Sequence, residues 1–190
     1  NLVKRKALQI DKDSLVVRRL KRVSSIVNKL KRFERMNLPR MQDIAGCRAV
    51  VKSNRQVFEL RDLIVNSQVR HKLVKVFDYV NEPKPDGYRG IHLIFRYTGT
   101  RNPFNNHLVE IQLRSKYQHA WATAVEVVDT FTGQALKASE GLEDWKQFFL
   151  FTSIEFSRKE GTAVDPAYVD VPTLSKLRQL IDKLQFHLLL

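Results

Sequence analysis

The first clear pattern of apolar positions lies between residues 14 and 35. Apolar residues recur there at alternating steps of four and three, as on one face of an amphipathic helix: Val16, Leu20, Val23, Val27 and Leu30. The other faces of this segment are basic. Asp13 or Ser14 is a suitable cap for its first turn, and Ser24 suits a second helix if the chain breaks near Arg22. The pattern therefore predicts helix, either as one element or as two.

The segment between residues 46 and 114 contains several short apolar runs that are typical of strands, and one stretch with helical spacing. The runs typical of strands are residues 46–51, 73–80, 91–97 and 108–114, and helical spacing appears near residues 57–64. Residues 81–87 combine two prolines with Asp-Gly, a strong loop signal. Strands interleaved with helices indicate an α+β or α/β domain. We expect an α+β fold with a mixed β-sheet of about 4 to 5 strands flanked by helices.

The last third of the chain is helical in pattern. Apolar residues at helical spacing predict helices over residues 117–128 and 142–152, and a final helix that begins at Pro172. Residues 161–171 resemble a linker. We therefore expect one domain over residues 1–160, followed by a linker and a truncated C-terminal helix over residues 161–190.

Charged residues are distributed unevenly along the chain. Of the formal net charge of +13, most belongs to residues 1–60, which hold 16 Lys and Arg against 5 Asp and Glu. Such a field favours phosphate-bearing partners, whether a nucleotide, RNA or an anionic membrane surface, although a solvated basic face is an equal alternative. No apolar run has the roughly 18 residues of a membrane span. With Cys47 as the single cysteine, no internal disulfide is available, and we expect a cytoplasmic protein without membrane partners.

Two acidic residues stand out as candidates for chemistry. Strand alternation over residues 108–114 places Glu110, Gln112 and Arg114 on one face, which is either a functional face or a polar solvent face. Asp43 is the only acid between Glu34 and Glu59, among several cations. It is either a structurally neutralised turn residue or a ligand of the divalent ion that accompanies a triphosphate.

The loop before the third predicted strand offers several binding groups. Tyr88 follows a glycine and presents a ring on which a base could stack. Lys84, Arg89 and His92 are suited to phosphates or ribose, and a charged hairpin turn is an equal alternative.

Four motifs in order resemble the synthetase domain of the RelA/SpoT alarmone enzymes, particularly the small single-domain synthetases. They are Arg19-x-Lys21-x-x-x-Ser25-Ile26-x-x-Lys29, Asp43-Ile44-Ala45-Gly46-x-Arg48, Asp78-Tyr79-Val80-x-x-Pro83-Lys84-Pro85-x-Gly87-Tyr88-Arg89-x-Ile91-His92 and Glu110-Ile111-Gln112-Leu113-Arg114. The resemblance covers roughly residues 15–126. It implies a nucleotidyltransferase-like fold and transfer of a pyrophosphoryl group from ATP to the 3′-hydroxyl of GDP or GTP, releasing AMP.

The resemblance also implies roles for individual residues. Arg19 and Arg48 would sandwich adenine, while Lys21, Ser25 and Lys29 would hold the triphosphate. Asp43 and Glu110 would hold Mg²⁺, with Glu110 also the base that takes the proton of the acceptor hydroxyl. Tyr88 would stack on the base of the acceptor nucleotide. The phosphates or ribose of this nucleotide would be held by Lys84, Arg89, His92, Gln112 and Arg114.

Departures from the family pattern keep other functions open. The acceptor loop here is Asp86-Gly87-Tyr88-Arg89-Gly90, where the family commonly has Asn-Gly-Tyr-x-Ser. One alternative is a toxic relative that pyrophosphorylates adenine nucleotides or the 3′ end of tRNA, and another is a non-catalytic RNA-binding module. The C-terminal helix is a candidate surface for a homo-oligomer, or for an antitoxin or regulatory segment.

Overall fold

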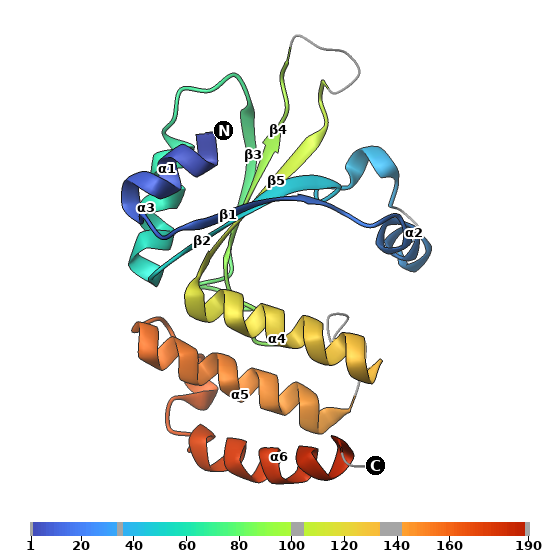
Figure 1. Ribbon diagram of the computed structural model, residues 1–190, viewed down its shortest axis with the longest axis vertical. Helices are drawn as coiled ribbons and strands as arrows, with labels where there is room; N and C mark the ends of the chain where they lie inside the picture. Colours follow the sequence, from blue (N-terminus) through green and yellow to red (C-terminus); the bar gives the residue numbers. More distant parts are fainter. Residues whose placement is uncertain (1, 34–35, 100–104, 134–141, 189–190) are drawn as a thin grey trace. The chain divides into compact units, whose positions relative to one another are not determined.

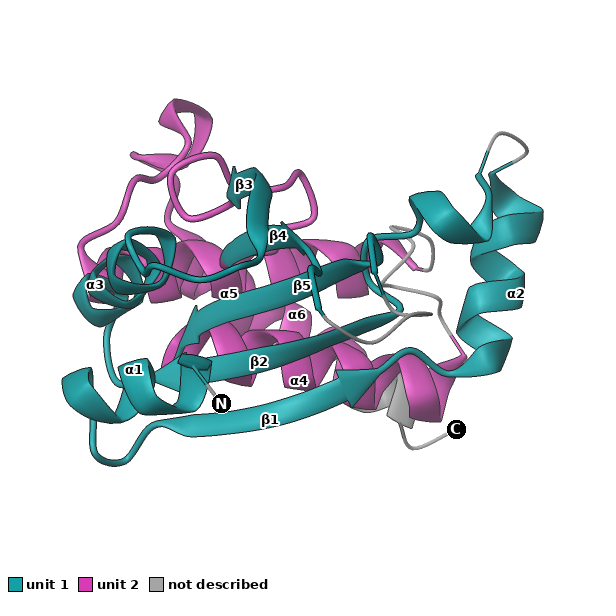
Figure 2. Ribbon diagram, turned by 90° about the horizontal axis from the view of Figure 1, so that it is seen from above, with its two compact units in different colours: residues 1–78, 91–115 teal, residues 79–90, 116–190 magenta. Residues whose placement is uncertain are grey.

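The computed structural model describes residues 2–33, 36–99, 105–133 and 142–188. It divides into two compact units, which Figure 2 colours separately. Unit 1 comprises residues 1–78 and 91–115, and unit 2 comprises residues 79–90 and 116–190. The chain therefore leaves unit 1 after its third strand, forms a loop of unit 2, and returns to complete the sheet.

Unit 1 is built on a five-stranded mixed sheet with the strand order β1-β2-β5-β4-β3. Its strands are β1 (Leu15–Leu20), β2 (Ala45–Val51), β3 (Lys72–Asp78), β4 (Ile91–Arg96) and β5 (Leu108–Ser115). The central pair β2 and β5 runs parallel, and the other neighbours run antiparallel. The predicted α+β fold is confirmed, and the four predicted strands correspond to β2, β3, β4 and β5.

Two helices of unit 1 pack against this sheet and against each other (Figure 1). The helix α3 (Asn54–Val65) buries Val57, Leu60 and Ile64 completely, and Ser53 caps it by accepting a hydrogen bond from the Gln56 backbone. The helix α1 (Leu2–Ile10) was not predicted, although it buries Val3 and Ala7. Two buried positions are too few to give a clear apolar stripe in the sequence.

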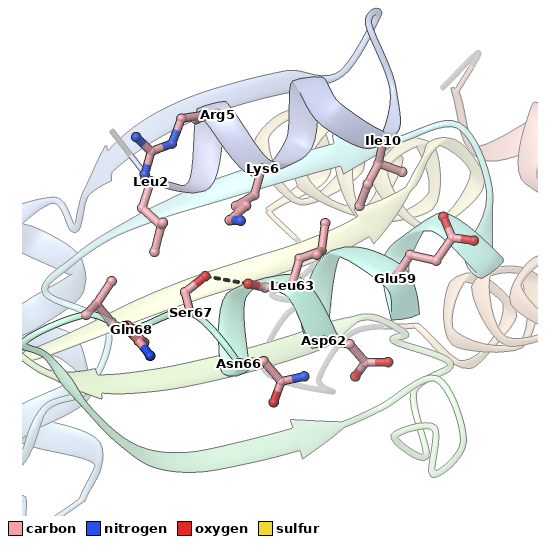
Figure 3. A pocket seen from close by; sticks show the side chains of 11 residues that line it. Leu2, Arg5, Lys6, Ile10, Glu59, Asp62, Leu63, Asn66, Ser67 and Gln68 are labelled. Atoms are coloured by element: carbon pink, nitrogen blue, oxygen red, sulfur yellow. Dashed lines mark hydrogen bonds between the residues drawn. The ribbon is translucent and has the colours of Figure 1, made fainter.

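An open groove of about 720 Å³ runs between α1 and α3. Figure 3 shows Arg5 and Lys6 of α1 on one wall and Glu59 and Asp62 of α3 on the other, with Ser67 bonded to the backbone of α3. None of the residues described along this groove belongs to the predicted nucleotide site.

The helix predicted over residues 14–35 is wrong in its first part. Residues Leu15–Leu20 form β1, an edge strand paired antiparallel with β2. Its Val16 and Val17 favour extended backbone. The hydrogen-bonded ladder with β2 outweighs the helical periodicity of the apolar residues, which is only a local preference. Leu20 is 79% exposed, so the expected apolar stripe does not continue into a core.

One helix, α2 (Val23–Arg32), follows β1 directly. Its first turn receives no side-chain cap, so the expected role of Ser24 is also wrong. In Figure 1, α2 lies beyond the end of β1, away from α1 and α3. No residue of α2 is buried, and the 3-10 helix η1 (Leu38–Arg40) leads from it towards β2. Residues 34–35 of the predicted helix lie outside the described residues.

The described residues of unit 2 form three α-helices, with the loop of residues 79–90 packed on them. The helices are α4 (Lys116–Thr132), α5 (Glu143–Glu160) and α6 (Thr173–Leu188), and α5 contacts both of the others. Aromatic residues form the core between α4 and α5: Trp121, Trp145 and Phe149, with Leu184 of α6. The 3-10 helix η3 (Pro166–Tyr168) interrupts the predicted linker. None of the described helices is long and apolar enough to cross a membrane.

Candidate active site

Asp43 stands two residues before β2 and holds two ammonium groups. The Lys21 Nζ lies 2.7 Å from its Oδ2, and the Lys29 Nζ lies 2.9 Å from its Oδ1. Lys21 directly follows β1, and Lys29 belongs to α2. Burial by itself raises the pKa of Asp43, but the hydrogen bonds and charges of the two lysines outweigh it and lower the pKa. Asp43 is therefore ionised at neutral pH and ties α2 to the start of β2.

Glu110 lies in β5 with both carboxylate oxygens engaged. The His92 Nδ1 lies 2.8 Å from Oε1, and the Gln112 Nε2 donates to Oε2 at 2.7 Å. Burial by itself raises the pKa of Glu110, the bonds from His92 and Gln112 lower it, and the charge of Asp43 raises it again. The net effect of these contributions is a lowered pKa for Glu110. The charge of Asp43 therefore acts on Glu110, but less strongly than the bonds from His92 and Gln112.

A row of paired residues crosses three strands beside Glu110. Arg48 of β2 and His92 of β4 both pair in register with Gln112 of β5, so their side chains share one face. The Arg48 Nε donates to the Gln112 Oε1 at 3.2 Å, and the Arg114 Nη2 donates to the same oxygen at 3.4 Å. Since a guanidinium can only donate, these bonds leave the Gln112 Nε2 to donate to Glu110.

The shared face of Glu110, Gln112 and Arg114 is not a solvent face. Gln112 and Arg114 are each 5% exposed, which makes that alternative wrong. Burying such polar groups costs free energy unless they are hydrogen-bonded, and the bonds among them offset part of this cost. The predicted alternation is confirmed, and the face it defines is a buried polar network.

A second row includes a glycine. Arg19 of β1 pairs with Gly46 of β2, and Gly46 pairs with Glu110 of β5. A Cβ at Gly46 would lie 2.1 Å from the Glu110 backbone oxygen, so only glycine permits this strand pairing. Arg48 lies two residues further along β2 and is a diagonal neighbour of Arg19 on the same face, at a spacing of roughly 7–8 Å for such positions.

The remaining predicted residue of the donor side is Ser25. It is exposed on α2, one turn before Lys29. Ser25 and Lys29 therefore lie on one side of the helix, the side from which Lys29 reaches Asp43.

Three predicted acceptor residues belong to unit 2. The Lys84 Nζ lies 4.7 Å from the ring centre of Tyr79 and 5.1 Å from that of Tyr88. Tyr88 also meets Trp121 edge to face, with ring centres 6.2 Å apart. The Arg89 guanidinium is buried and donates to backbone carbonyls of the same unit.

The predicted residues thus form two groups. Those of unit 1 gather around the two carboxylates: Arg19, Lys21, Ser25, Lys29, Asp43, Arg48, His92, Glu110, Gln112 and Arg114. Those of unit 2 are Lys84, Tyr88 and Arg89. Sequence reasoning missed Ser153, whose hydroxyl donates to the Gly87 carbonyl of the loop. No local signal could have found it, because the contact spans 66 positions.

The donor chemistry of unit 1 fits a magnesium ion bound together with phosphate. Among the described residues there is no cluster of three or more His, Cys, Asp or Glu that could hold a metal by itself. Asp43 and Glu110 supply hard carboxylate oxygens within one unit, and Mg²⁺ characteristically takes one or two carboxylates and completes its shell with water and phosphate.

Comparison with known proteins gives a consistent set of relatives. The model of the region found in RelA/SpoT proteins matches residues 18–128. The GTP pyrophosphokinases YwaC and YjbM of Bacillus subtilis (strain 168) are 33% identical over 114 residues and 32% identical over 111 residues. These matches cover 55% and 57% of this chain and 52% of each relative, so the chain spans about half the length of the curated relatives it matches.

A solved structure extends the match beyond the sequence motifs. The small alarmone synthetase 1 of Bacillus subtilis, bound to its product pppGpp, superposes with a TM-score of 0.67 at 28% identity. The superposition covers 77% of this chain and 74% of that one. The family model covers more than half of the chain and includes both carboxylates and the polar rows beside them. The chain belongs to the RelA/SpoT family.

Proposed function

We propose that this chain transfers the pyrophosphoryl group of ATP to the 3′-hydroxyl of GDP or GTP, which yields (p)ppGpp and AMP. The observation that carries the proposal is the Glu110 carboxylate, ionised and fixed by His92 and Gln112 in the unit that also holds a second ionised carboxylate, Asp43. Family membership, and relatives that are named GTP pyrophosphokinases or bind pppGpp, support it.

The donor nucleotide would occupy the basic side of unit 1. Arg19 and Arg48 are diagonal neighbours across β1 and β2, and their spacing of roughly 7–8 Å accepts one aromatic base stacked between two guanidinium planes. Lys21 and Lys29 hold Asp43 in the described structure and would exchange part of this contact for triphosphate oxygens. Ser25 would donate its hydroxyl to the same phosphates.

The transfer itself needs alignment, charge neutralisation and a proton acceptor. The acceptor 3′-oxygen forms a bond to the β-phosphorus of ATP, and the bond from that phosphorus to the oxygen shared with the α-phosphorus breaks. AMP leaves with the bonding electron pair, and Glu110 takes the proton of the hydroxyl. Asp43 and Glu110 would hold Mg²⁺, which when bound neutralises charge on the phosphates.

Each unit by itself carries residues that the family resemblance assigns to the acceptor. Tyr88 presents an aromatic ring for the guanine base, with Lys84 beside it for phosphate oxygens. In unit 1, His92 and Arg114 would contact the ribose or phosphates, because they border Glu110 and Gln112 on the same face.

Product analysis by mass spectrometry tests this function. Purified protein with Mg²⁺ and ATP is offered GDP, GTP, ADP and deacylated tRNA in separate reactions, and we expect AMP together with ppGpp or pppGpp only with the guanine nucleotides. Glu110→Gln should lower the rate at least about a hundredfold, the usual contribution of a general base. Glu59→Gln, on the groove wall of α3 and outside the proposed nucleotide site, is the matched control.

Other outcomes identify the alternatives. Transfer to ADP or to tRNA would replace the acceptor while retaining the chemistry. Salt-sensitive RNA binding without AMP, unchanged in Glu110→Gln, would instead indicate a non-catalytic RNA-binding module.

A further inference from the structure

The loop of residues 79–90 is anchored to the helices of unit 2 at two points. The first anchor is Gly87, whose carbonyl accepts a hydrogen bond from the buried hydroxyl of Ser153 in α5. The loop lies close to the helix there, since a Cβ at Gly87 would be 3.0 Å from the Ser153 Cβ and 3.3 Å from the Leu150 Cα. The φ of Gly87 is 89°, in the region that favours glycine.

The second anchor is Arg89, which is 6% exposed. Its Nη1 donates to the Val80 carbonyl at 3.0 Å and its Nη2 donates to the Ala163 carbonyl at 2.9 Å. Val80 and Arg89 lie near the two ends of the loop, and Ala163 follows α5. One guanidinium therefore closes the base of the loop and joins it to the segment after α5.

The residues proposed to meet the acceptor lie between or beside these anchors. The Lys84 backbone N–H donates to the Tyr88 carbonyl, and the Gly87 N–H donates to the Lys84 carbonyl. The Tyr88 ring packs edge-on against Trp121 of α4 and against Tyr79. Movement of Gly87 or Arg89 would therefore move Tyr88, which lies between them in the chain.

We propose that Ser153 and Arg89 are positioning residues, which hold the loop so that Lys84 and Tyr88 can receive the guanine nucleotide. This inference rests on the proposed function for the identity of the acceptor. It assigns Arg89 to the backbone of unit 2 instead of to an acceptor phosphate. Binding a phosphate would take the guanidinium away from the Val80 and Ala163 carbonyls. A buried carbonyl that loses its hydrogen-bond donor destabilises the fold by the free energy of its desolvation.

A pair of serines on α5 gives a matched test. Ser153→Ala removes the anchor on Gly87, whereas Ser157→Ala removes a hydroxyl of similar burial that donates only within α5, to the Ser153 carbonyl. We expect Ser153→Ala to speed amide hydrogen exchange in residues 81–88 and to raise the acceptor KM about fivefold or more, the effect of one hydrogen bond. The KM for ATP should change in neither variant.

This comparison separates the two proposals. Hydrogen exchange needs no turnover, so it decides the anchoring even if no guanine nucleotide yields AMP and the proposed function fails. Equal exchange and equal acceptor KM in Ser153→Ala and Ser157→Ala would overturn the positioning role. A parallel rise in the KM for ATP in Ser153→Ala would also overturn it, because it would indicate a general loss of structure.

Two substitutions of Arg89, which differ in the charge and shape of the new side chain, test its role as an anchor. Arg89→Lys keeps a positive charge but loses the fork that reaches two carbonyls, and Arg89→Met loses both. If Arg89 is an anchor, both variants should loosen the loop and raise the KM for GDP and for GTP by similar factors. Near wild-type KM values in Arg89→Lys, with a large rise confined to Arg89→Met, would assign Arg89 to an acceptor phosphate and overturn its positioning role.

Discussion

At Glu110, burial and hydrogen bonding act on one carboxylate in opposite directions. Burial favours the protonated form, while His92 and Gln112 stabilise the ionised form and lower the pKa. Two guanidinium groups fix the orientation of the Gln112 amide, so its N–H faces the carboxylate. As the proposed proton acceptor, Glu110 is ionised at neutral pH. The activity should therefore fall only when the pH drops below the lowered pKa of the Glu110 carboxyl.

Replacing Gln112 with a glutamate, Gln112→Glu, tests this arrangement. The introduced carboxylate would keep the contacts with Arg48 and Arg114 but could not donate to Glu110, and its charge would repel that residue. The pKa of Glu110 should rise, so the acid limb of the kcat profile should move to higher pH by about one unit or more. The measurement is kcat from about pH 3 to 9, a range that extends below the usual pKa of a carboxyl and above that of a histidine.

The matched control for this variant is Gln56→Glu, the same change on α3. An unmoved acid limb in Gln112→Glu, together with a raised acceptor KM, would contradict the prediction and assign Gln112 to the acceptor instead.

At the scale of elements, the parallel pair β2 and β5 joins the strands of unit 1 that carry the proposed donor and acceptor residues. Gly46 allows these strands to approach beside Glu110. On either side of the glycine stand Arg19 and Glu110, one in β1 and one in β5. A side chain at this point would separate the strands that carry the proposed chemistry.

Gly46→Ala should therefore lower both stability and activity. The added Cβ meets backbone, which cannot rotate away, and we expect a loss of at least about 1–3 kcal/mol in the free energy of unfolding. Thermal unfolding and AMP release are measured together. Gly133→Ala is the control, because its φ of 64° costs stability while no atom lies within 4 Å of the added Cβ. Full activity in a stable Gly46→Ala variant would contradict the importance of this approach.

At the scale of the whole molecule, the formal charge of +13 is concentrated in residues 1–60. The structure uses part of it at short range, where Lys21 and Lys29 contact Asp43. The exposed remainder includes Arg18, Arg22 and Arg32 of β1, α2 and the chain between them. A field of this kind raises the local concentration of a polyanion and is weakened by salt.

Salt should therefore affect ATP capture more than the chemical step. Between about 50 and 200 mM salt, with Mg²⁺ held constant, we expect the KM for ATP to rise several-fold and kcat to change less, because exposed charges are screened more than half-buried ones. Steady-state kinetics across this range provides the measurement, with an equal osmolarity of sucrose as the control. A KM for ATP that does not respond to salt would show that the exposed cations have no part in binding.

Patterns that depend on neighbouring positions could be predicted from the sequence alone. The alternation in β5 placed Glu110, Gln112 and Arg114 on one face, and the helical spacing of Val57, Leu60 and Ile64 located α3. Both follow from the fixed geometry of strands and helices, which local sequence expresses directly. The ordered motifs likewise identified the family before any fold was known, since they require only residue types at set distances.

The tertiary structure decided what depends on distant partners. It made Leu15–Leu20 a strand because β2 offers a ladder that the local pattern does not encode. It buried the polar face of β5 instead of exposing it, and it engaged the Arg89 guanidinium with backbone 74 positions away. In each case a hydrogen bond or a packing contact between segments far apart in the chain outweighed local preference, and such contacts exist only once the chain has folded.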